Sequence, residues 1–471
     1  METTYLKRKI DDFLPAWRAR DSHFPLIVKG ARQVGKTEAI RNFARRSYES
    51  FIEINFVERP EFKGIIQNGY GASEVVKAIS LIDPSCRFIT GKTLIFFDEI
   101  QEFPDIATTF KFFKQDGRFD VIASGSLLGI HCKHIRSIAV GFQEDYTLRS
   151  FDFEEFMRAR GYDDAFFDDI FSHMADKRPF SELEHQVLSS RFLDFCVIGG
   201  MPRVVGEFIE KGSFENSLAL QRKILHDYRD DVRKYATGVD QTRILNVFDH
   251  IAPRLAQENK KFQITKVAKG ARFADYRGCI EWLEDAGVVN VCHSMTHPSL
   301  PIKGHYDESK FKLYMADSGL LVSMLDDEAQ MNLRARADLG IYKGGLYENI
   351  VAEALRKLEY QLVFYKRVDS TLEEDFFVRN DTDLIPVEVK ASDGRAQSLK
   401  TLISSEAYKD IRWGIKLHSG NIGWANNVLA LPYYLTFLLR KYIASCDPLD
   451  RPAPQAPAEP LDDPWLGKVD R

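Results

Sequence analysis

The sequence contains no closely spaced pair of cysteines. Its six cysteines are scattered along the chain, at positions 86, 132, 196, 279, 292 and 446. Structural zinc sites and disulfide-rich secreted domains both need cysteines at short, regular spacings. The spacing therefore argues against a zinc site and a disulfide framework, and it predicts reduced thiols in a cytoplasmic protein.

The sequence also lacks a long apolar run and a strong excess of charge. The apolar stretch at 428–439 contains a proline and two tyrosines, and it has about half the length that a membrane span needs. Residues 1–30 carry charges throughout and contain no apolar signal-peptide core. We therefore expect no membrane partner. The net charge of −5 gives no general affinity for nucleic acid, so any DNA-binding surface must be local.

A phosphate-binding loop lies near the start of the chain. Residues 30–37 read G-A-R-Q-V-G-K-T, which is the P-loop spacing G-x-x-x-x-G-K-[ST], between an apolar strand and a predicted helix at 36–46. The glycines let backbone N–H groups converge on phosphate oxygens, Lys36 reaches the β- and γ-phosphates, and Thr37 can ligate Mg²⁺. The sequence therefore predicts a nucleoside triphosphate site. Its predicted binding residues are Gly30, Ala31, Arg32, Gln33, Val34, Gly35, Lys36, Thr37 and Glu38.

An acidic pair follows a later apolar strand. The run 93–97 has the character of a strand buried on both faces of a parallel sheet, and it ends in Asp98 and Glu99. At the carboxyl end of such a strand, Asp98 can hold Mg²⁺ and Glu99 can orient and deprotonate the attacking water. The strand at 119–123 leads to Ser124, which we expect between the phosphate loop and Glu99, where it can sense the γ-phosphate. An ordinary turn serine is the alternative.

The middle of the chain is predicted to be helical. We interpret residues 153–235 as a lid over the ATPase core. Further on, helices are predicted at 242–257, 264–270 and 274–286, and strands at 288–291 and 311–315. Three helices and a β-hairpin are typical of a winged helix-turn-helix. A local group of basic residues suggests a phosphate-contacting face, and a protein-docking or spacer module is the alternative. The group consists of Lys260, Lys261, Lys266, Lys269, Arg272 and Arg277.

A second acidic cluster is predicted in the C-terminal region. Its predicted elements are a helix at 347–358 and strands at 362–365, 375–378 and 384–390. A turn at 381–382 places Asp375 opposite Glu388, and side-chain alternation puts Lys390 on the same face. Glu348 is available from the preceding helix. Carboxylates with a lysine can bind a divalent metal and activate a water. A salt-bridge cluster on an exposed sheet face is the alternative.

Several motifs occur together in this chain. They are F-F-D-E-I-Q-E-F-P-D at 96–105 with Lys111 downstream, A-S-G-S-L-L-G at 123–129, F-D-F-E-E-F at 151–156, G-G-M-P at 199–202, Y-R-D-D at 228–231, E-N-K-K-F at 258–262, Y-E-N at 347–349, V-E-V-K at 387–390 and L-P-Y-Y at 431–434. With the phosphate loop, the combination resembles the bacterial and archaeal AAA-type ATPases that carry a fused C-terminal winged-helix and nuclease-like region. The resemblance implies ATP and Mg²⁺ as cofactors, with Lys36 and Glu99 in catalysis.

The C-terminal cluster resembles the PD-(D/E)XK nuclease core. Asp375, Glu388 and Lys390 match its catalytic motif, and Glu348 corresponds to its helical acid, so the resemblance implies a second divalent metal. An intact motif does not by itself imply cleavage, because such a domain can also bind DNA or support assembly. No arginine finger can be assigned by match. Arg136 and Arg149 are candidates, with ordinary surface arginines as the alternative.

The expected architecture is an α/β protein of several domains. A chain of 471 residues is long enough for about three. The expected parts are a P-loop AAA-type ATPase core with a parallel sheet at 1–158, a helical lid at 159–238, a winged helix-turn-helix at 239–335, a small restriction-endonuclease-like α/β domain at 340–443 and a disordered Pro-rich tail at 444–471.

The main functional hypothesis is a cytoplasmic, Mg²⁺-dependent ATPase coupled to a DNA-binding or nuclease-like domain. The alternative is an ATP-controlled switch or scaffold whose C-terminal domain binds DNA or protein without cleaving. Assembly into homo-oligomers is compatible with both.

Overall fold

The computed structural model describes residues 5–126, 141–236, 239–255, 262, 272–325, 327–334, 342–368, 370–390 and 396–449. The contacts divide the chain into two compact units. The first contains Met1–Gly161, Arg191–Ser294 and Asp307–Leu362, and the second contains Tyr162–Ser190, Met295–Tyr306 and Val363–Arg471. Among the described residues, no helix combines the length and the apolar character that a membrane crossing requires.

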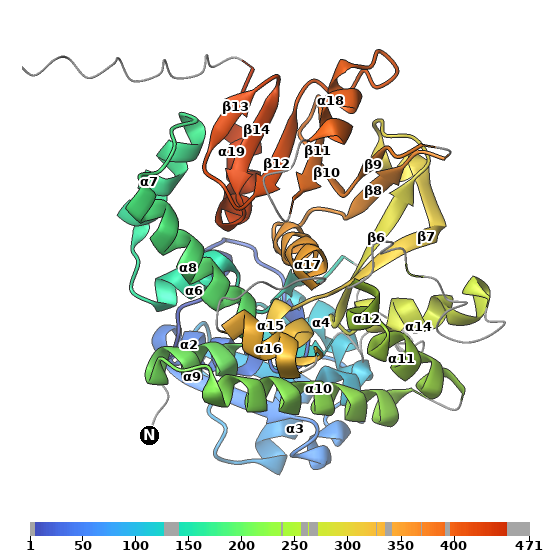
Figure 1. Cartoon of the computed structure of the whole chain (residues 1–471). Helices are drawn as coiled ribbons and strands as arrows, with labels where there is room; N and C mark the ends of the chain where they lie inside the picture. The colour runs from blue at the N-terminus through green and yellow to red at the C-terminus, as the bar shows by residue number, and fades with distance from the viewer. Residues whose placement is uncertain are drawn as a thin grey trace, which may run out of the picture. The chain divides into compact units, whose positions relative to one another are not determined.

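The first unit is built on a five-stranded parallel sheet, whose residues fall in the blue to cyan part of the colour bar in Figure 1. Its strands are β1 (Leu26–Gly30), β2 (Ser50–Asn55), β3 (Thr93–Asp98), β4 (Asp120–Ser126) and β5 (Glu144–Thr147). They lie in the order β2-β3-β4-β1-β5, and every neighbouring pair is parallel. β3 is buried along its whole length, as the continuous apolar run predicts. Because β4 lies between β1 and β3, the carboxyl ends of these three strands are adjacent.

Helices connect these strands and provide the apolar core of the unit. They are α1 (Ile10–Arg18), α2 (Lys36–Ser47), η1 (Pro60–Gly64), α3 (Ala72–Ile82), η2 (Ile100–Glu102), η3 (Pro104–Thr109) and α4 (Phe110–Asp116). Ile54 and Phe97 from the sheet belong to one buried cluster with Val75 of α3 and Phe110 of α4. This packing holds the strand ends, and therefore the loops that follow them, in fixed positions.

The first unit continues with further helices and two long strands. They are α6 (Phe153–Ala159), the C-terminal part of α8 (Glu182–Ile198), α9 (Pro202–Lys211), α10 (Glu215–Tyr235), α11 (Val239–Asp249), α12 (Ile251–Leu255), α14 (Phe273–Asp285), β6 (Val289–Met295), β7 (Tyr306–Met315), α15 (Ser318–Ser323), α16 (Asp327–Arg334) and α17 (Tyr342–Lys357). β6 and β7 are neighbours in one sheet. The helix predicted at 242–257 is divided into α11 and α12. The helix predicted at 264–270 and the basic residues Lys260, Lys261, Lys266 and Lys269 lie outside the described residues.

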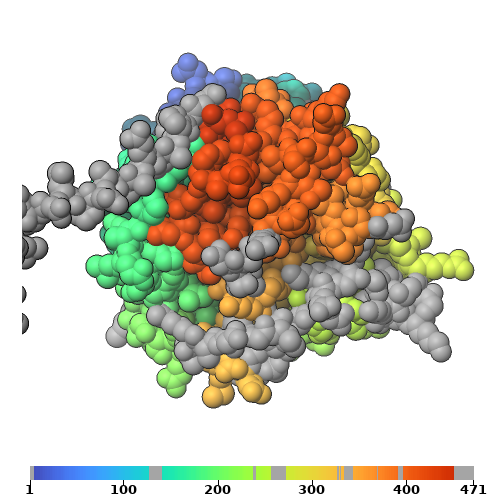
Figure 2. Space-filling view, turned by 45° about the horizontal axis from the view of Figure 1, so that its top comes forward, coloured from blue at the N-terminus to red at the C-terminus, as the bar shows by residue number. Residues whose placement is uncertain are grey.

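The second unit contains its own mixed sheet. Its elements are α7 (Asp164–Ala175), the first turns of α8, η4 (Ile302–His305), β8 (Val363–Lys366), β9 (Glu373–Glu374), β10 (Phe376–Arg379), β11 (Leu384–Val389), α18 (Gln397–Ser404), β12 (Gly414–His418), β13 (Gly423–Ala425), β14 (Val428–Pro432), η5 (Tyr433–Leu438) and α19 (Leu439–Ser445). The larger sheet has the order β10-β11-β12-β14-β13. β10 and β11 form an antiparallel hairpin, and β12 adds to β11 in parallel. In Figure 2 these C-terminal strands and helices form one continuous block, coloured orange to red.

Specific contacts attach α7 and the start of α8 to this second unit. The Asn421 side chain pairs with both backbone groups of Phe180, at 3.0 and 2.8 Å. The Lys177 ammonium donates to the carbonyl of Pro448 at 2.5 Å. The segment predicted as a lid, 159–238, is therefore divided between the two units. Within the segment predicted as a tail, 444–471, the contact of Pro448 ties the first residues to the fold, and residues from 450 lie outside the described part.

Backbones meet closely at Gly200, in the turn between α8 and α9. The Gly200 carbonyl accepts the N–H of Phe151 at 2.7 Å, and the Gly200 N–H donates to the Asp317 carboxylate at 2.8 Å. The Lys357 ammonium donates to the carbonyl of Phe151 at 2.6 Å. A Cβ atom on residue 200 would lie 2.1 Å from that same carbonyl oxygen. Glycine is therefore the residue that lets the ends of α8, α15 and α17 meet the segment before α6.

We expect Gly200→Ala to destabilise the first unit by about 1–3 kcal/mol, because the new methyl group overlaps backbone that cannot move aside. The matched control is Gly206→Ala in α9, where a Cβ atom meets nothing within 4 Å. This control should be neutral or stabilising by about 0.5–1 kcal/mol, since alanine is the better helix former. Chemical denaturation followed by circular dichroism measures both. Equal stabilities of the two variants would contradict the close packing at Gly200.

Candidate functional site

The predicted phosphate loop connects β1 to α2. Gly35 precedes the first turn of α2 with a φ of 90°, a left-handed conformation that glycine adopts without strain. The Lys36 ammonium donates to the carbonyl oxygens of Gly30 and Ala31, at 3.0 and 2.9 Å. The side chain thus folds back over the loop, where the β- and γ-phosphates of a nucleotide are expected. The predicted loop residues from Gly30 to Glu38 therefore form one connected turn at the N-terminus of a helix, which favours anion binding.

Lys36 is buried in an environment that disfavours its charge. Burial lowers the pKa of Lys36 to about 8, with a smaller contribution from Arg32, although Glu99 and Asp98 act in the opposite direction. A phosphate placed at the loop would supply the missing negative charge. The positive charge of Lys36 is therefore better stabilised when a nucleotide phosphate is bound at the loop than when the loop is empty.

Asp98 collects hydrogen bonds from the neighbouring elements. One carboxylate oxygen accepts from the Thr37 hydroxyl at 3.1 Å and from the Asn55 amide at 3.2 Å. The other accepts from the Glu99 N–H at 3.0 Å and from the Ser124 hydroxyl. Thr37 and Asp98 are thus brought together, and their oxygen atoms fit the preference of Mg²⁺ for hard oxygen ligands. Their role as its ligands stays a prediction. Asn55 was not predicted. Its only signal in the sequence is its place at the end of the strand that pairs with β3.

Glu99 lies at the rim of the sheet in an unusual backbone conformation. Its φ is 55°, which is uncommon for a residue other than glycine and is concentrated at functional sites. The Gln101 amide donates to the Glu99 carboxylate. This position, directly after the Asp98 that bonds to Thr37, fits a base that orients a water beside the loop. Ser124 is buried and bonds to Asp98, and its predicted sensing of the γ-phosphate stays a prediction.

Two segments that are distant in sequence, the start of the chain and the helix α10, form hydrogen bonds with the phosphate loop. Arg8, at the start of the chain, donates to the Val34 carbonyl at 3.2 Å and to the Glu155 carboxylate at 3.0 Å. The helix α10 contacts the same loop through Gln33, whose amide donates to Asp227 at 2.7 Å. Neither Arg8 nor α10 was predicted as part of the site, because nothing in a single sequence indicates which distant segment covers a loop.

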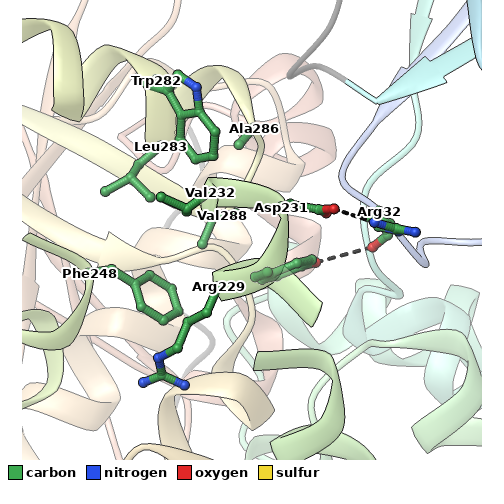
Figure 3. Close-up of a pocket in the computed structure, with 10 residues that line it drawn as sticks. Arg32, Arg229, Asp231, Val232, Phe248, Trp282, Leu283, Ala286 and Val288 are labelled. Carbon is green, nitrogen blue, oxygen red and sulfur yellow. Dashed lines mark hydrogen bonds and ion pairs between the residues drawn. The ribbon is translucent and has the colours of Figure 1, made fainter. Parts of the chain in front are cut away.

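The α10 contacts centre on Arg32 (Figure 3). The Arg32 guanidinium forms an ion pair with Asp231, and the Tyr228 hydroxyl donates to the Arg32 carbonyl at 3.1 Å. These contacts lie beside an apolar pocket, whose other lining residues are Arg229, Val232, Phe248, Trp282, Leu283, Ala286 and Val288. The Y-R-D-D segment at 228–231 thus supplies two of the loop's partners.

The predicted C-terminal cluster assembles on the hairpin of β10 and β11. Phe376 pairs with Val387, which is the register predicted from the turn at 381–382. The Asp375 carboxylate accepts the Val389 N–H at 3.0 Å, and Lys390 pairs with Glu388 at 2.5 Å. The hairpin therefore brings Asp375, Glu388 and Lys390 to the same end of the two strands.

Glu388 is the most enclosed member of this cluster. Its side chain is buried, and its second carboxylate oxygen has no hydrogen-bond partner within the described residues. Burial raises the pKa of Glu388, although Lys390 and Lys416 oppose the shift. Lys416 stands opposite Glu388 in β12. A buried carboxylate with one open oxygen fits a metal ligand, and it equally fits a buried ion pair.

Glu348, the fourth residue predicted for this cluster, lies in α17 of the first unit. Its carboxylate accepts from the Lys312 ammonium at 3.0 Å and from the Tyr314 hydroxyl. All three side chains are buried. Within the first unit, Glu348 therefore ties α17 to β7, and its role as a metal ligand stays a prediction.

Of the two arginine-finger candidates, Arg149 lies in the described part of the chain. Arg149 pairs with Glu359 at 3.3 Å, as in a structural ion pair, and burial lowers its pKa although Glu359 opposes the shift. Arg136 lies outside the described residues. Neither gains support as a finger.

One further group could hold a cation. Ligand atoms of Asp169, His173 and Glu184 lie within 4.8 Å of one another. However, Glu184 accepts the Ser181 N–H at 2.7 Å at the start of α8, which is a helix-capping contact. We therefore interpret this group as the closure of the α7–α8 turn.

Three segments of the chain match known families. Residues 22–157 match the AAA domain, residues 189–331 match a domain of unknown function (DUF8612), and residues 343–434 match a second domain of unknown function (DUF4143). No curated protein matches the chain. The first match agrees with the loop, the parallel sheet and the acidic pair. Residues 22–157 are therefore an AAA-type P-loop ATPase domain.

Solved structures give more distant similarities. The chain is similar to a Walker-type ATPase of Pyrococcus abyssi, with 13% identity and a TM-score of 0.43 over 68% of this chain and 96% of that one. It is also similar to the ORC1 protein of Aeropyrum pernix in complex with DNA, with 13% identity and a TM-score of 0.30 over 71% and 93% of the two chains. The chain is also similar to Drosophila ORC bound to DNA, with 12% identity and a TM-score of 0.26 over 70% of this chain and 95% of that one. At these TM-scores the similarities carry no weight for the function.

The lowered pKa of Lys36, about 8, predicts a pH dependence of nucleotide binding. Only the protonated lysine attracts phosphate, and a bound phosphate raises the pKa of the lysine, so binding takes up a proton above pH 8. We expect ATP affinity to fall about 25-fold between pH 7.5 and 9.5, because the protonated fraction of a lysine with a pKa of about 8 falls from about three quarters to about 3% over that range. Equilibrium titrations at a series of pH values measure this. In Lys36→Arg, whose side chain stays charged, the dependence should flatten, and an equally steep dependence would contradict the assignment.

Proposed function

We propose that the chain is a Mg²⁺-dependent ATPase whose hydrolysis cycle controls a metal-dependent, nuclease-like C-terminal domain that acts on DNA. The observation that carries the ATPase part is the contact of Thr37 with Asp98, with Glu99 directly after it at the rim. In P-loop ATPases a hydroxyl and a carboxylate in this arrangement hold Mg²⁺, and an acid beside them orients the attacking water. ATP and Mg²⁺ are the cofactors that this donor set fits.

The roles of the site residues follow from their positions. Lys36 binds the β- and γ-phosphates in place of the loop carbonyls that it now contacts. Ser124, buried beside Asp98, positions the carboxylate and senses the γ-phosphate. The helices and hairpin from 239 to 335 form the winged-helix module, and residues 340–443 form the nuclease-like domain.

The nuclease-like part of the proposal is supported by Asp375, Glu388 and Lys390. Two carboxylates on adjacent strands can hold a divalent metal, and a lysine beside them can stabilise the charge that develops on a phosphate during cleavage. Glu388 offers a buried oxygen that has no hydrogen-bond partner in the described part of the chain, which is the feature expected of an unfilled coordination position.

A second candidate function is an ATP-controlled switch whose C-terminal domain binds DNA or protein without cleaving. The ion pair between Lys390 and Glu388 at 2.5 Å favours it, because a carboxylate neutralised by an ammonium needs no metal. The two candidates share the ATP site and differ in whether this cluster binds a divalent ion.

Two substitutions test the ATPase assignment. Lys36→Ala should weaken ATP binding at least tenfold, because it removes the charge-assisted contacts to the phosphates. Glu99→Gln should keep ATP binding and reduce hydrolysis by about 10²–10⁴-fold, the range expected for loss of a general base. Titrations with ATP and release of inorganic phosphate provide the two measurements. Glu102→Gln is the matched control, since Glu102 lies in the same 3₁₀ turn and pairs with Lys234. Unchanged hydrolysis in Lys36→Ala would refute the assignment.

A separate experiment addresses the C-terminal cluster. Calorimetric titration of the full chain with Mn²⁺, without nucleotide, should reveal a site that Asp375→Asn weakens about tenfold, as for loss of one charged ligand. The control Asp381→Asn changes an exposed turn residue of the same hairpin and should leave this site intact. Nicking of supercoiled DNA should require Lys390 as well as the carboxylates. Metal binding without nicking would favour the switch. If Asp375→Asn reduces neither the affinity for Mn²⁺ nor the nicking of DNA, a metal site at this cluster is refuted.

A further inference from the structure

The phosphate loop carries a second long cation, Arg32, whose partner lies outside the loop. Arg32 pairs with Asp231, a residue of α10. The arginine side chain is 52% exposed, whereas the aspartate is 4% exposed. The arginine can therefore leave the pair by rotating into solvent, while the carboxylate stays fixed in the packed helix.

The pair belongs to a compact set of contacts between the loop and one face of α10. The Gln33 amide donates to Asp227 at 2.7 Å, and the Tyr228 hydroxyl donates to the Arg32 carbonyl at 3.1 Å. Asp227 and Asp231 stand one helical turn apart, so they face the loop together. Next to these contacts, Arg229 and Val232 of α10 border the apolar pocket together with Phe248 of α11 and Trp282 of α14, as Figure 3 shows. The state of the loop is thus connected to a helix that also packs on α11 and lines a pocket together with α14.

Arg32 lies within the electrostatic field of the predicted catalytic groups. Burial opposes its charge, but its pKa is raised because Asp231 and, to a smaller extent, Glu99 stabilise the cation. It also contributes to the lowered pKa of Lys36. The charge of the guanidinium is therefore coupled to the phosphate-binding lysine, which lies in the same loop, and to the proposed base.

A triphosphate bound at this loop would compete with Asp231 for the guanidinium. Arginine forms bidentate, charge-assisted hydrogen bonds with phosphate oxygens as readily as with a carboxylate. The terminal phosphate is the part of ATP that ADP lacks. A partner exchange driven by it would therefore distinguish the two nucleotides.

We propose that Arg32 exchanges Asp231 for the γ-phosphate of bound ATP, and that this exchange removes the ion pair by which the loop holds α10. Arg32 then acts as a γ-phosphate-contacting residue supplied in cis, and Asp231 is its partner in the absence of ATP. The inference rests on the proposed function, because it needs ATP at the loop. It adds the residue that reads the nucleotide state and the helix that receives the signal.

The first test compares the affinities of ADP and of a non-hydrolysable ATP analogue in Mg²⁺ buffer. Arg32→Ala should weaken analogue binding about tenfold or more, which corresponds to the loss of a charged hydrogen-bond pair, and should change ADP binding less than about twofold. Arg32→Lys, which keeps the charge without the bidentate geometry, should fall between these values. Asp231→Asn should strengthen analogue binding several-fold and leave ADP unchanged.

The matched control is Arg233→Ala. Arg233 forms an exposed ion pair with Asp230 on the same helix, at 2.7 Å, and its removal should alter neither affinity. Lys36→Ala distinguishes a failure of the nucleotide site from a failure of the exchange. If Lys36→Ala leaves both affinities unchanged, the nucleotide site itself is wrong. If it abolishes both while Arg32→Ala weakens ADP and the analogue equally, or weakens neither, the site stands and the exchange is refuted.

A second measurement reports on α10 directly. Amide hydrogen exchange in residues 227–235 should speed up when the ATP analogue binds to the unaltered protein, because the helix has lost its ion pair with the loop. ADP should not cause this change, and Arg32→Ala should exchange quickly with either nucleotide. Should Asp231→Asn fail to fold, Arg32→Ala and Arg32→Lys still decide the outcome. Equal protection of α10 with both nucleotides would show that the ion pair only stiffens the loop.

Discussion

The hydrogen bonds to the buried carboxylate of Asp98 are the interaction on which the geometry of the nucleotide site depends. They come from Thr37 at the start of α2, Asn55 at the end of β2, Ser124 at the end of β4 and the backbone of Glu99. A buried carboxylate without such donors would pay a large desolvation penalty. Satisfying Asp98 therefore fixes the ends of three strands and one helix relative to one another, and the loop and Glu99 take their positions from it.

Much of this arrangement could be predicted because it depends on neighbours in sequence. A strand, a glycine loop and a helix in that order place Lys36 and Thr37 without knowledge of the rest of the fold. An apolar run that ends in two acids likewise places Asp98 and Glu99 at a sheet rim. The hairpin register of Asp375 and Glu388 followed from the turn alone, since side-chain alternation propagates from it.

The parts that escaped prediction depend on tertiary packing. β5 has alternating half-buried and exposed residues, so it lacks the apolar run by which the other strands were recognised. Arg8 and Asp231 reach the loop from segments far away in the chain. Glu348 was placed on the correct helix, but its contacts with Lys312 and Tyr314 could not be derived. Helix periodicity indicates which side of a helix is buried, but it does not indicate which strand or helix packs against that side.

The two acidic clusters differ in how their charge is balanced, and this difference bears on their chemistry. The hydrogen-bond donors around Asp98 are neutral, so they orient the carboxylate without cancelling its charge, and a divalent cation gains its full attraction. At the C-terminal cluster the ammonium of Lys390 already neutralises Glu388. A metal there must share the carboxylate with the lysine, which makes the second acid, Asp375, necessary for tight binding. The first site can therefore hold a divalent cation without displacing a charged partner, whereas metal binding at the second requires that the metal compete successfully with a lysine.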